Sequence, residues 1–238
     1  MILVHGSAGG LDSWDPVLPM ITPAFEAWVY ARRGYPPSGS AASPKLFAHD
    51  VADLSAVIAA AGGSAHVIGA SYGASVVLHA LLDGPAGIRS AVLFEPPLYA
   101  AGSALEPVLA EYSHLIEVGD APGAARHFAE KVARVPIPLL DALGPQEPDP
   151  DELMGCLHDL EAMVADAAGL DQWRGIRIPF LLLSGEDTWE PMPATMQALA
   201  AAVPNAEHVR LAGQSHFATH TAPQQFADAV ISYLVDPR

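Results

Sequence analysis

The chain has 238 residues, of which 51% are hydrophobic and 16% charged, and its formal charge is −16 at pH 7. This length and composition allow one domain with a buried core and a small insertion, and they exclude a largely disordered chain. The excess of acidic residues, with no concentration of Lys or Arg, argues against nucleic acid and anionic membrane surfaces as partners.

The single cysteine, Cys156, excludes an internal disulfide framework and has no neighbours in sequence with metal-ligand spacing. The sequence shows no apolar run of about 18 residues that would span a membrane. It also lacks the basic and apolar regions of a signal peptide at its start. We therefore expect a cytoplasmic protein that binds no metal.

Short β-branched runs alternate with helical patterns, which is typical of an α/β fold: a mostly parallel sheet with helices on both faces. The expected strands, in chain order, are Met1–His5, Ala27–Ala31, Ala65–Ala70, Ser90–Phe94, Phe180–Ser184 and His208–Ala212. The helices expected to flank them are Leu46–Ala61, Ser71–Leu82, Met192–Ala202 and Pro223–Leu234.

The alternation stops between Pro96 and Trp173, where the pattern is helical. The helices expected there are Leu105–Val118, Ala121–Val135 and Asp151–Ala167, with the proline-rich Pro136–Pro150 before the last. A helical insertion after a strand of an open sheet is expected to cover the carboxyl ends of the strands, where such sheets bind ligands. We expect a core of residues 1–96 and 174–238 and a helical cap, or lid, of residues 97–173. An extra helical layer with no gating role is the alternative.

The segment Gly69-Ala70-Ser71-Tyr72-Gly73 directly follows an apolar strand and opens an apolar helix. This is the pattern of a nucleophile elbow, a sharp turn that exposes a serine hydroxyl above the sheet. Small residues are needed at Gly69 and Gly73 because larger ones would crowd the neighbouring strand and helix. An ordinary glycine-rich turn is the alternative.

A serine nucleophile needs hydrogen-bond donors for the negative charge that its attack creates. The segment His5-Gly6-Ser7 follows the first strand, so the backbone N–H groups of Ser7 and Tyr72 are the candidate donors of an oxyanion hole. His5 is expected to anchor this loop and not to transfer protons.

The candidate base is His216, because Gly213-Gln214-Ser215-His216 follows the last strand and so lies at the same edge of the sheet as Ser71. His220 is the nearest rival, and His208 lies within the strand. A solvated loop histidine is the alternative.

These motifs, together with Arg32–Gly39 and Phe94-Glu95-Pro96-Pro97, resemble the α/β-hydrolase superfamily, most of all its cofactor-free, lidded bacterial esterase-like members. The resemblance implies a Ser–His–acid triad, a helical cap, and no metal or organic cofactor. Dehalogenases and epoxide hydrolases of this fold use aspartate at the elbow, so Ser71 argues against those two activities.

The sequence departs from the superfamily pattern at its start. Common members carry two more strands before the His-Gly loop, and we expect the fold of this chain to lack them. The strand Ala27–Ala31 then becomes an edge of the sheet, and exposed edges favour pairing with another chain. We expect either a homodimer through that edge or residues upstream of Met1 that cover it.

The second departure concerns the triad acid. Its commonest place in the superfamily corresponds to Thr188, which cannot ionise. We expect the acid at Glu95, because this residue ends an apolar strand and a buried carboxylate there needs a partner. Some superfamily members, including certain dehalogenases and lipases, carry their acid at the end of this strand. Asp187 is the alternative.

The expected function is hydrolysis of an ester, thioester or lactone of a mostly hydrophobic small molecule through an acyl-serine intermediate. The alternative is a non-hydrolytic lyase or cyclase of a biosynthetic pathway, or a ligand-binding receptor, on the same fold.

Overall fold

A computed structural model describes residues 1–82, 87–203 and 205–235. Within these residues six parallel strands form one sheet in the order β2–β1–β3–β4–β5–β6. The strands are β1 (Ile2–Val4), β2 (Trp28–Val29), β3 (Ala65–Ala70), β4 (Ile88–Phe94), β5 (Phe180–Gly185) and β6 (Ala206–Leu211). The predicted α/β fold with a parallel sheet flanked by helices is confirmed.

The predicted helices are present, with ends shifted by a few residues at most sites, and the structure has short helices in addition. Those of the core are α1 (Leu18–Ile21), α2 (Phe47–Ala60), α3 (Tyr72–Leu82), α8 (Met192–Ala202), α9 (Ala218–Thr221) and α10 (Pro223–Val235). Those between β4 and β5 are α4 (Glu106–Glu117), α5 (Ala121–Lys131), α6 (Ile137–Leu143) and α7 (Pro150–Ala165). Short 3-10 turns occur at Leu11–Trp14, Ser103–Leu105 and Asp171–Gly175. No helix of the described ranges is long and apolar enough to cross a membrane.

Successive strand residues point to opposite faces of the sheet, and helices cover both faces, so both sets of side chains are buried. Ile2, Val67 and Leu93 belong to the core cluster that includes residues of α2, α3 and α8. Their neighbours Leu3, Ile68 and Val92 belong to the cluster that includes residues of α1 and α10. Continuous apolar strands of this kind are therefore the expected signature of a parallel sheet between two helical layers.

The chain order reverses beside β1, and this reversal positions the candidate site. β2 follows β1 on one side, whereas β3 pairs with β1 on the other, with Val4 opposite Gly69. In open parallel sheets such a switch point leaves a crevice outside the carboxyl ends of the two strands. The loop after β1 begins at His5 and the turn after β3 contains Ser71, so both segments meet at this crevice.

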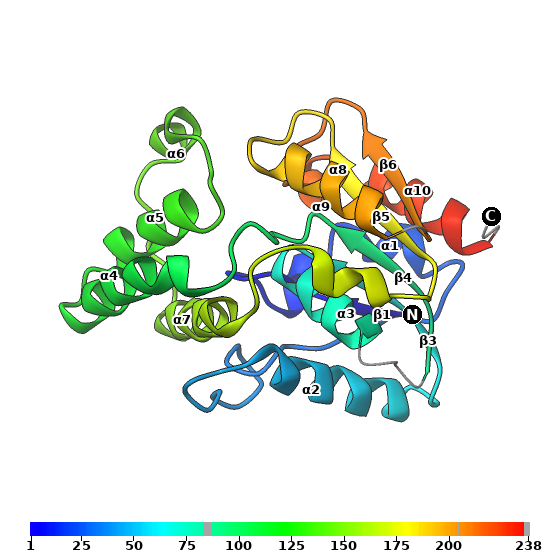
Figure 1. The fold of residues 1–238 in the computed structure, drawn as a ribbon, viewed down its shortest axis with the longest axis horizontal. Coiled ribbons are helices and arrows are strands. Elements are labelled where there is room, and N and C mark those ends of the chain that lie inside the picture. The colour runs from blue at the N-terminus through cyan, green and yellow to red at the C-terminus, as the bar shows by residue number, and fades with distance from the viewer. Residues whose placement is uncertain (83–86, 204, 236–238) are drawn as a thin grey trace.

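The α4–α7 segment lies beyond the carboxyl ends of the strands, to one side of the sheet and its flanking helices (Figure 1). The structure adds α6, a short helix inside the proline-rich Pro136–Pro150 stretch that precedes α7. Pro136 precedes the first turn of α6 and Pro138 lies within it, where a missing N–H costs no helical hydrogen bond. The division into core and cap stays a prediction at this point.

The edge strand β2 is shorter than predicted, with two residues in place of the five of Ala27–Ala31. Its partner is β1 alone, so β2 forms one edge of the described sheet. Trp28 is 36% exposed there. Whether another chain or further residues cover this edge stays a prediction.

Candidate active site

Ser71 sits in a strained backbone conformation between β3 and α3. Its φ angle is +53°, a left-handed region that residues other than glycine rarely adopt. Two glycines make the turn sterically feasible: a Cβ on Gly69 would collide with the backbone of Gly73, and one on Gly73 would collide with the backbone of Val4 and His5. The strain is thus held by tight packing of β1, β3 and α3, as at a nucleophile elbow.

The loop after β1 lies directly against the serine. A Cβ on Gly6 would lie 3.0 Å from Ser71 Cβ, so a side chain there would crowd the serine. In the part of the chain that the structure describes, the backbone N–H groups of Ser7 and Tyr72 donate to no backbone or side-chain acceptor. Two free donors thus flank Ser71 from two different segments.

His216 contacts a buried carboxylate. Its Nδ1 donates a hydrogen bond of 2.6 Å to Glu95 Oε2, and the Glu95 side chain is fully buried at the end of β4. The rival histidines are placed elsewhere: His220 pairs with its neighbour Thr219 and His208 with Ser184 on β5.

Glu95 is held from three directions. Besides the His216 ring, the backbone N–H of Gly185 donates to its Oε1 at 2.8 Å, and the hydroxyl of Thr188 donates to its Oε2 at 3.1 Å. Thr188 therefore helps to orient the Glu95 carboxylate. Asp187 is exposed, and its backbone N–H donates to Gln214 O.

His5 is fully buried behind the same loop. Its Nε2 accepts from the backbone N–H of Arg32 at 3.0 Å and its Nδ1 donates to Gly6 O at 2.8 Å. Burial, followed by the charge of Arg32, lowers the pKa of His5 to about 3. A ring that stays neutral and uses both nitrogens inside the protein orients the loop and does not shuttle protons.

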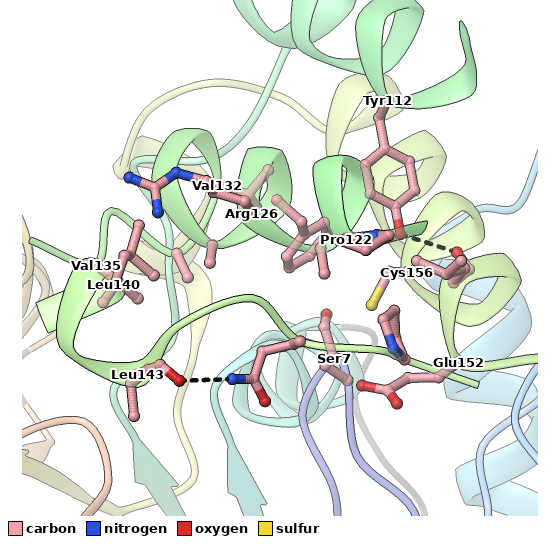
Figure 2. Close-up of a pocket in the computed structure, with 18 of the residues that line it drawn as sticks. Ser7, Tyr112, Pro122, Arg126, Val132, Val135, Leu140, Leu143, Glu152 and Cys156 are labelled. Atoms are coloured by element: carbon pink, nitrogen blue, oxygen red, sulfur yellow. Dashed lines mark hydrogen bonds between the residues drawn. The ribbon is translucent and has the colours of Figure 1, made fainter. Parts of the chain in front are cut away.

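A cavity of about 650 Å³ opens beside Ser71, and Ser7, Ser71 and His216 all line it. The remaining wall is mostly apolar and comes mainly from the α4–α7 segment. Figure 2 shows Ser7, Cys156 and Glu152 on one side of this space and, on the other, Pro122 of α5 and Val132, which follows α5. The structure thus provides a mainly apolar space next to the serine.

Cys156 also lines the cavity, but it is buried. Burial raises the pKa of the Cys156 thiol to about 12, so the thiol is protonated at neutral pH and is a poor nucleophile. Among the described residues, no group of three or more His, Cys, Asp and Glu side chains is arranged to hold a metal ion.

A cluster of four buried charges, which was not predicted from the sequence, lies next to the loop after β1. Arg32, Lys45, Asp50 and Asp159, called the ion cluster below, have side chains at most 1% exposed. Burial alone would raise the pKa of the Asp159 carboxyl, but Arg32 and Lys45 hold that pKa well below its ordinary value. A sequence signal exists: Asp159 lies on the apolar face of α7 together with Cys156, Leu160 and Met163, where a carboxylate requires a cationic partner.

The model of the alpha/beta hydrolase family matches residues 1–229 of this chain. No curated protein sequence matches it. Among solved structures, an alpha/beta hydrolase from Sphaerobacter thermophilus is 28% identical, with a TM-score of 0.84 over 98% of this chain and 91% of that one. An enol-lactonase from Burkholderia xenovorans (20% identity, TM-score 0.75, 99% and 90% covered) and a thermophilic esterase from Thermogutta terrifontis (17%, 0.76, 98% and 88%) share the fold.

Proposed function

Because this chain belongs to the alpha/beta hydrolase family and is an enzyme of the hydrolase type, we propose that it cleaves an ester, thioester or lactone through an acyl-serine intermediate. Ser71 is the nucleophile, His216 the base and Glu95 the acid that orients it. The observation that carries the proposal is the 2.6 Å hydrogen bond from His216 Nδ1 to the buried Glu95, because it leaves Nε2 free to take a proton in the cavity that Ser71 lines.

In the first half-reaction Ser71 Oγ attacks the carbonyl carbon while its proton passes to His216 Nε2. The carbonyl oxygen becomes an oxyanion, which accepts hydrogen bonds from the backbone N–H groups of Ser7 and Tyr72. The tetrahedral intermediate collapses by breaking the bond to the alcohol or thiol, which leaves with the proton from His216. The charge of Glu95 stabilises the imidazolium in between.

In the second half-reaction a water molecule takes the place of the leaving group. His216 removes its proton, the hydroxide adds to the acyl carbon, and the tetrahedral intermediate returns the electron pair to Ser71 Oγ, which regains the proton from His216. A carboxylic acid is released. Two structural neighbours are an enol-lactonase and an esterase, which supports an ester or lactone as the bond that is cleaved.

The α4–α7 segment is proposed as a cap, or lid, over this site. It supplies most of the apolar cavity wall, including Val132, Leu140 and Leu153. A mostly hydrophobic small molecule therefore fits the cavity best. Removing water from the site also strengthens the electrostatic interactions that the mechanism needs.

The same enclosed, apolar cavity favours the second candidate, a non-hydrolytic lyase or cyclase. The two are separated by pre-steady-state kinetics with short-chain aryl esters. A hydrolase whose deacylation is slow releases one equivalent of phenol in a burst and then turns over, and Ser71→Ala abolishes both phases.

A panel of acyl esters, thioesters and lactones completes the test. If none is turned over while a fluorophosphonate still labels Ser71, hydrolysis is rejected and the non-hydrolytic candidate takes its place. If the fluorophosphonate labels Ser71→Ala as fast as the wild-type protein, the nucleophile itself is wrongly placed.

A further inference from the structure

The ion cluster joins one helix of the α4–α7 segment to the loop that carries a proposed oxyanion donor. Asp159 comes from α7, whereas Arg32 follows β2 and Lys45 precedes α2. The guanidinium of Arg32 donates to both oxygens of Asp159, from Nη1 at 2.8 Å and from Nη2 at 2.7 Å. Lys45 Nζ donates to Asp159 Oδ1 at 2.8 Å. The charges of this cluster are therefore matched inside the protein.

Arg32 also donates hydrogen bonds to the loop after β1. Its Nε donates to His5 O at 2.9 Å and its Nη2 donates to Gly6 O at 3.0 Å. Gly6 O also accepts from the His5 ring. The carbonyl of Gly6 and the N–H of Ser7 belong to one planar peptide group, in which the two bonds point in opposite directions. Fixing this carbonyl therefore fixes the direction of the Ser7 N–H.

Asp159 holds the same residue a second time. The hydroxyl of Ser7 donates to Asp159 Oδ2 at 2.8 Å. The peptide N–H of Ser7 is thus restrained from its carbonyl side through Arg32 and from its side chain through Asp159. Both restraints end at one carboxylate on α7.

The second proposed donor is held by the same cluster. The hydroxyl of Tyr72 donates to Asp50 Oδ2 at 2.9 Å, and Lys45 Nζ contacts the same oxygen at 2.9 Å. The guanidinium carbon of Arg32 lies 4.4 Å from the centre of the Tyr72 ring. Tyr72, the first residue of α3, is therefore anchored to the ion cluster by its side chain.

The docking of α7 is close enough to make these contacts specific. A Cβ on Gly155, one turn before Asp159, would collide with the ring of Tyr35, so this glycine lets α7 approach. The Tyr35 hydroxyl donates to Asp159 Oδ2 at 2.7 Å. Tyr35 and Ser7 hence give the same carboxylate oxygen one hydroxyl donor each, but only Ser7 belongs to the loop.

We propose that Asp159 of α7 is a positioning residue for the oxyanion hole: through Arg32 and Ser7 it aligns the Ser7 N–H, so the α4–α7 segment sets the geometry in which Ser71 reacts. This inference rests on the proposed serine mechanism. It differs from a purely structural role of the ion cluster, which would change stability but not the stabilisation of the oxyanion.

The test compares Ser7→Ala with Tyr35→Phe in the full-length protein. Each substitution removes one hydroxyl donor to Asp159 Oδ2, and Ser7→Ala keeps the backbone N–H. The readout is the second-order rate constant for labelling of Ser71 by a fluorophosphonate, whose phosphoryl oxygen occupies the oxyanion hole, so no natural substrate is needed. Affinity for an aryl boronic acid, which forms a tetrahedral adduct with the serine, is the equilibrium counterpart. Thermal unfolding is measured in parallel.

We expect Ser7→Ala to slow labelling about tenfold and to weaken boronic acid binding by a similar factor, because a small displacement of a donor lowers the rate steeply. Tyr35→Phe should stay within about twofold of the wild type, although its loss of stability should be at least as large. Asp159→Asn, where it folds, should slow labelling about 10²-fold, since it loosens both restraints.

Equal labelling rates for Ser7→Ala and Tyr35→Phe would overturn the inference and leave the ion cluster a structural element. Failure of the wild-type protein to react with the fluorophosphonate would instead overturn the serine mechanism, and the inference with it. These outcomes are distinguishable because the first leaves the wild-type labelling of Ser71 intact.

Discussion

Two buried carboxylates, Glu95 bonded to His216 and Asp159 bonded to Ser7, differ in how their charge is matched. Asp159 faces two permanent cations, Arg32 and Lys45, at 2.7 to 2.8 Å. Within the described residues, the ion-pair partner of Glu95 is His216 alone, and its other hydrogen bonds come from a backbone N–H and a hydroxyl.

This difference in charge matching suits Glu95 to a direct part in the reaction and Asp159 to the positioning of its neighbours. A buried carboxylate without a permanent cation favours the arrival of a proton on the adjacent imidazole, which a general base requires. A carboxylate whose charge is already neutralised cannot respond to the reaction in this way, but it can hold its neighbours in place. Loss of Glu95 should therefore affect turnover more than stability, and loss of Asp159 should strongly affect both.

The largest expected effect is that of Glu95→Gln on turnover. The amide no longer fixes the tautomer of His216 or stabilises its protonated form, so kcat should fall by about 10⁴-fold. Steady-state kinetics on an aryl ester measures it. Asp187→Asn is the control, because Asp187 is exposed, and it should change kcat by less than about twofold. The reverse ranking of these two variants would place the triad acid at Asp187.

The second expected effect is that of Asp159→Asn on stability. Removing one charge of the ion cluster leaves a buried cation without its partner, which should lower the free energy of unfolding by about 3–5 kcal/mol. Urea denaturation at neutral pH measures this loss. Glu95→Gln should cost clearly less, because no permanent cation is left unpaired, and an equal cost for the two variants would contradict the comparison.

The stability difference between the wild-type protein and Asp159→Asn should depend on pH, because the pKa of Asp159 is lowered in the folded protein. The folded pKa of Asp159 lies below its ordinary value of 3.8, so the carboxylate contributes fully above that value and its contribution is lost as the pH falls below it. The stability difference between the wild-type protein and Asp159→Asn should be constant from neutral pH to about pH 5 and shrink below about pH 4. Urea curves over this range check the sign, and a difference that grows on acidification would contradict it.

The smallest expected effect is that of Thr188→Val, which removes the 3.1 Å hydrogen bond to Glu95 while keeping the side-chain shape. A hydrogen bond contributes about 1 kcal/mol net, so kcat should fall about fivefold. Thr188→Ser keeps the hydroxyl and should recover most of the rate. A larger loss in Thr188→Ser than in Thr188→Val would mean that the methyl packing of Thr188 matters and its hydroxyl does not.

The same two carboxylates show what could be predicted from the sequence. The strands, the turn at Ser71 and the position of Glu95 at a strand end are local patterns, and parallel strands bring their carboxyl ends together without further information. Asp159 contacts Arg32, which is 127 residues away, and Lys45, which is 114 away. Such contacts depend on how α7 packs against the rest of the chain, and the local hydrophobic pattern of the sequence does not predict that packing.

The other differences have similar causes. β2 keeps only two paired residues because its pairing depends on the short β1 beside it and not on its own propensity. α6 forms within a proline-rich stretch because its prolines fall before and within its first turn, where they are tolerated. The resemblance to a lidded hydrolase covered the helical insertion only in outline, and the ion cluster that fastens α7 to the core was not anticipated.

The covalent intermediate tests the central claim most directly. The wild-type protein is mixed with a short-chain aryl ester, quenched in acid within the burst phase, digested and examined by mass spectrometry. The account predicts that the acyl group is attached to Ser71, that Glu95→Gln accumulates the adduct far more slowly, and that Ser71→Ala forms none. Phenol release with no acyl group on Ser71, or with the acyl group on another residue, would contradict it.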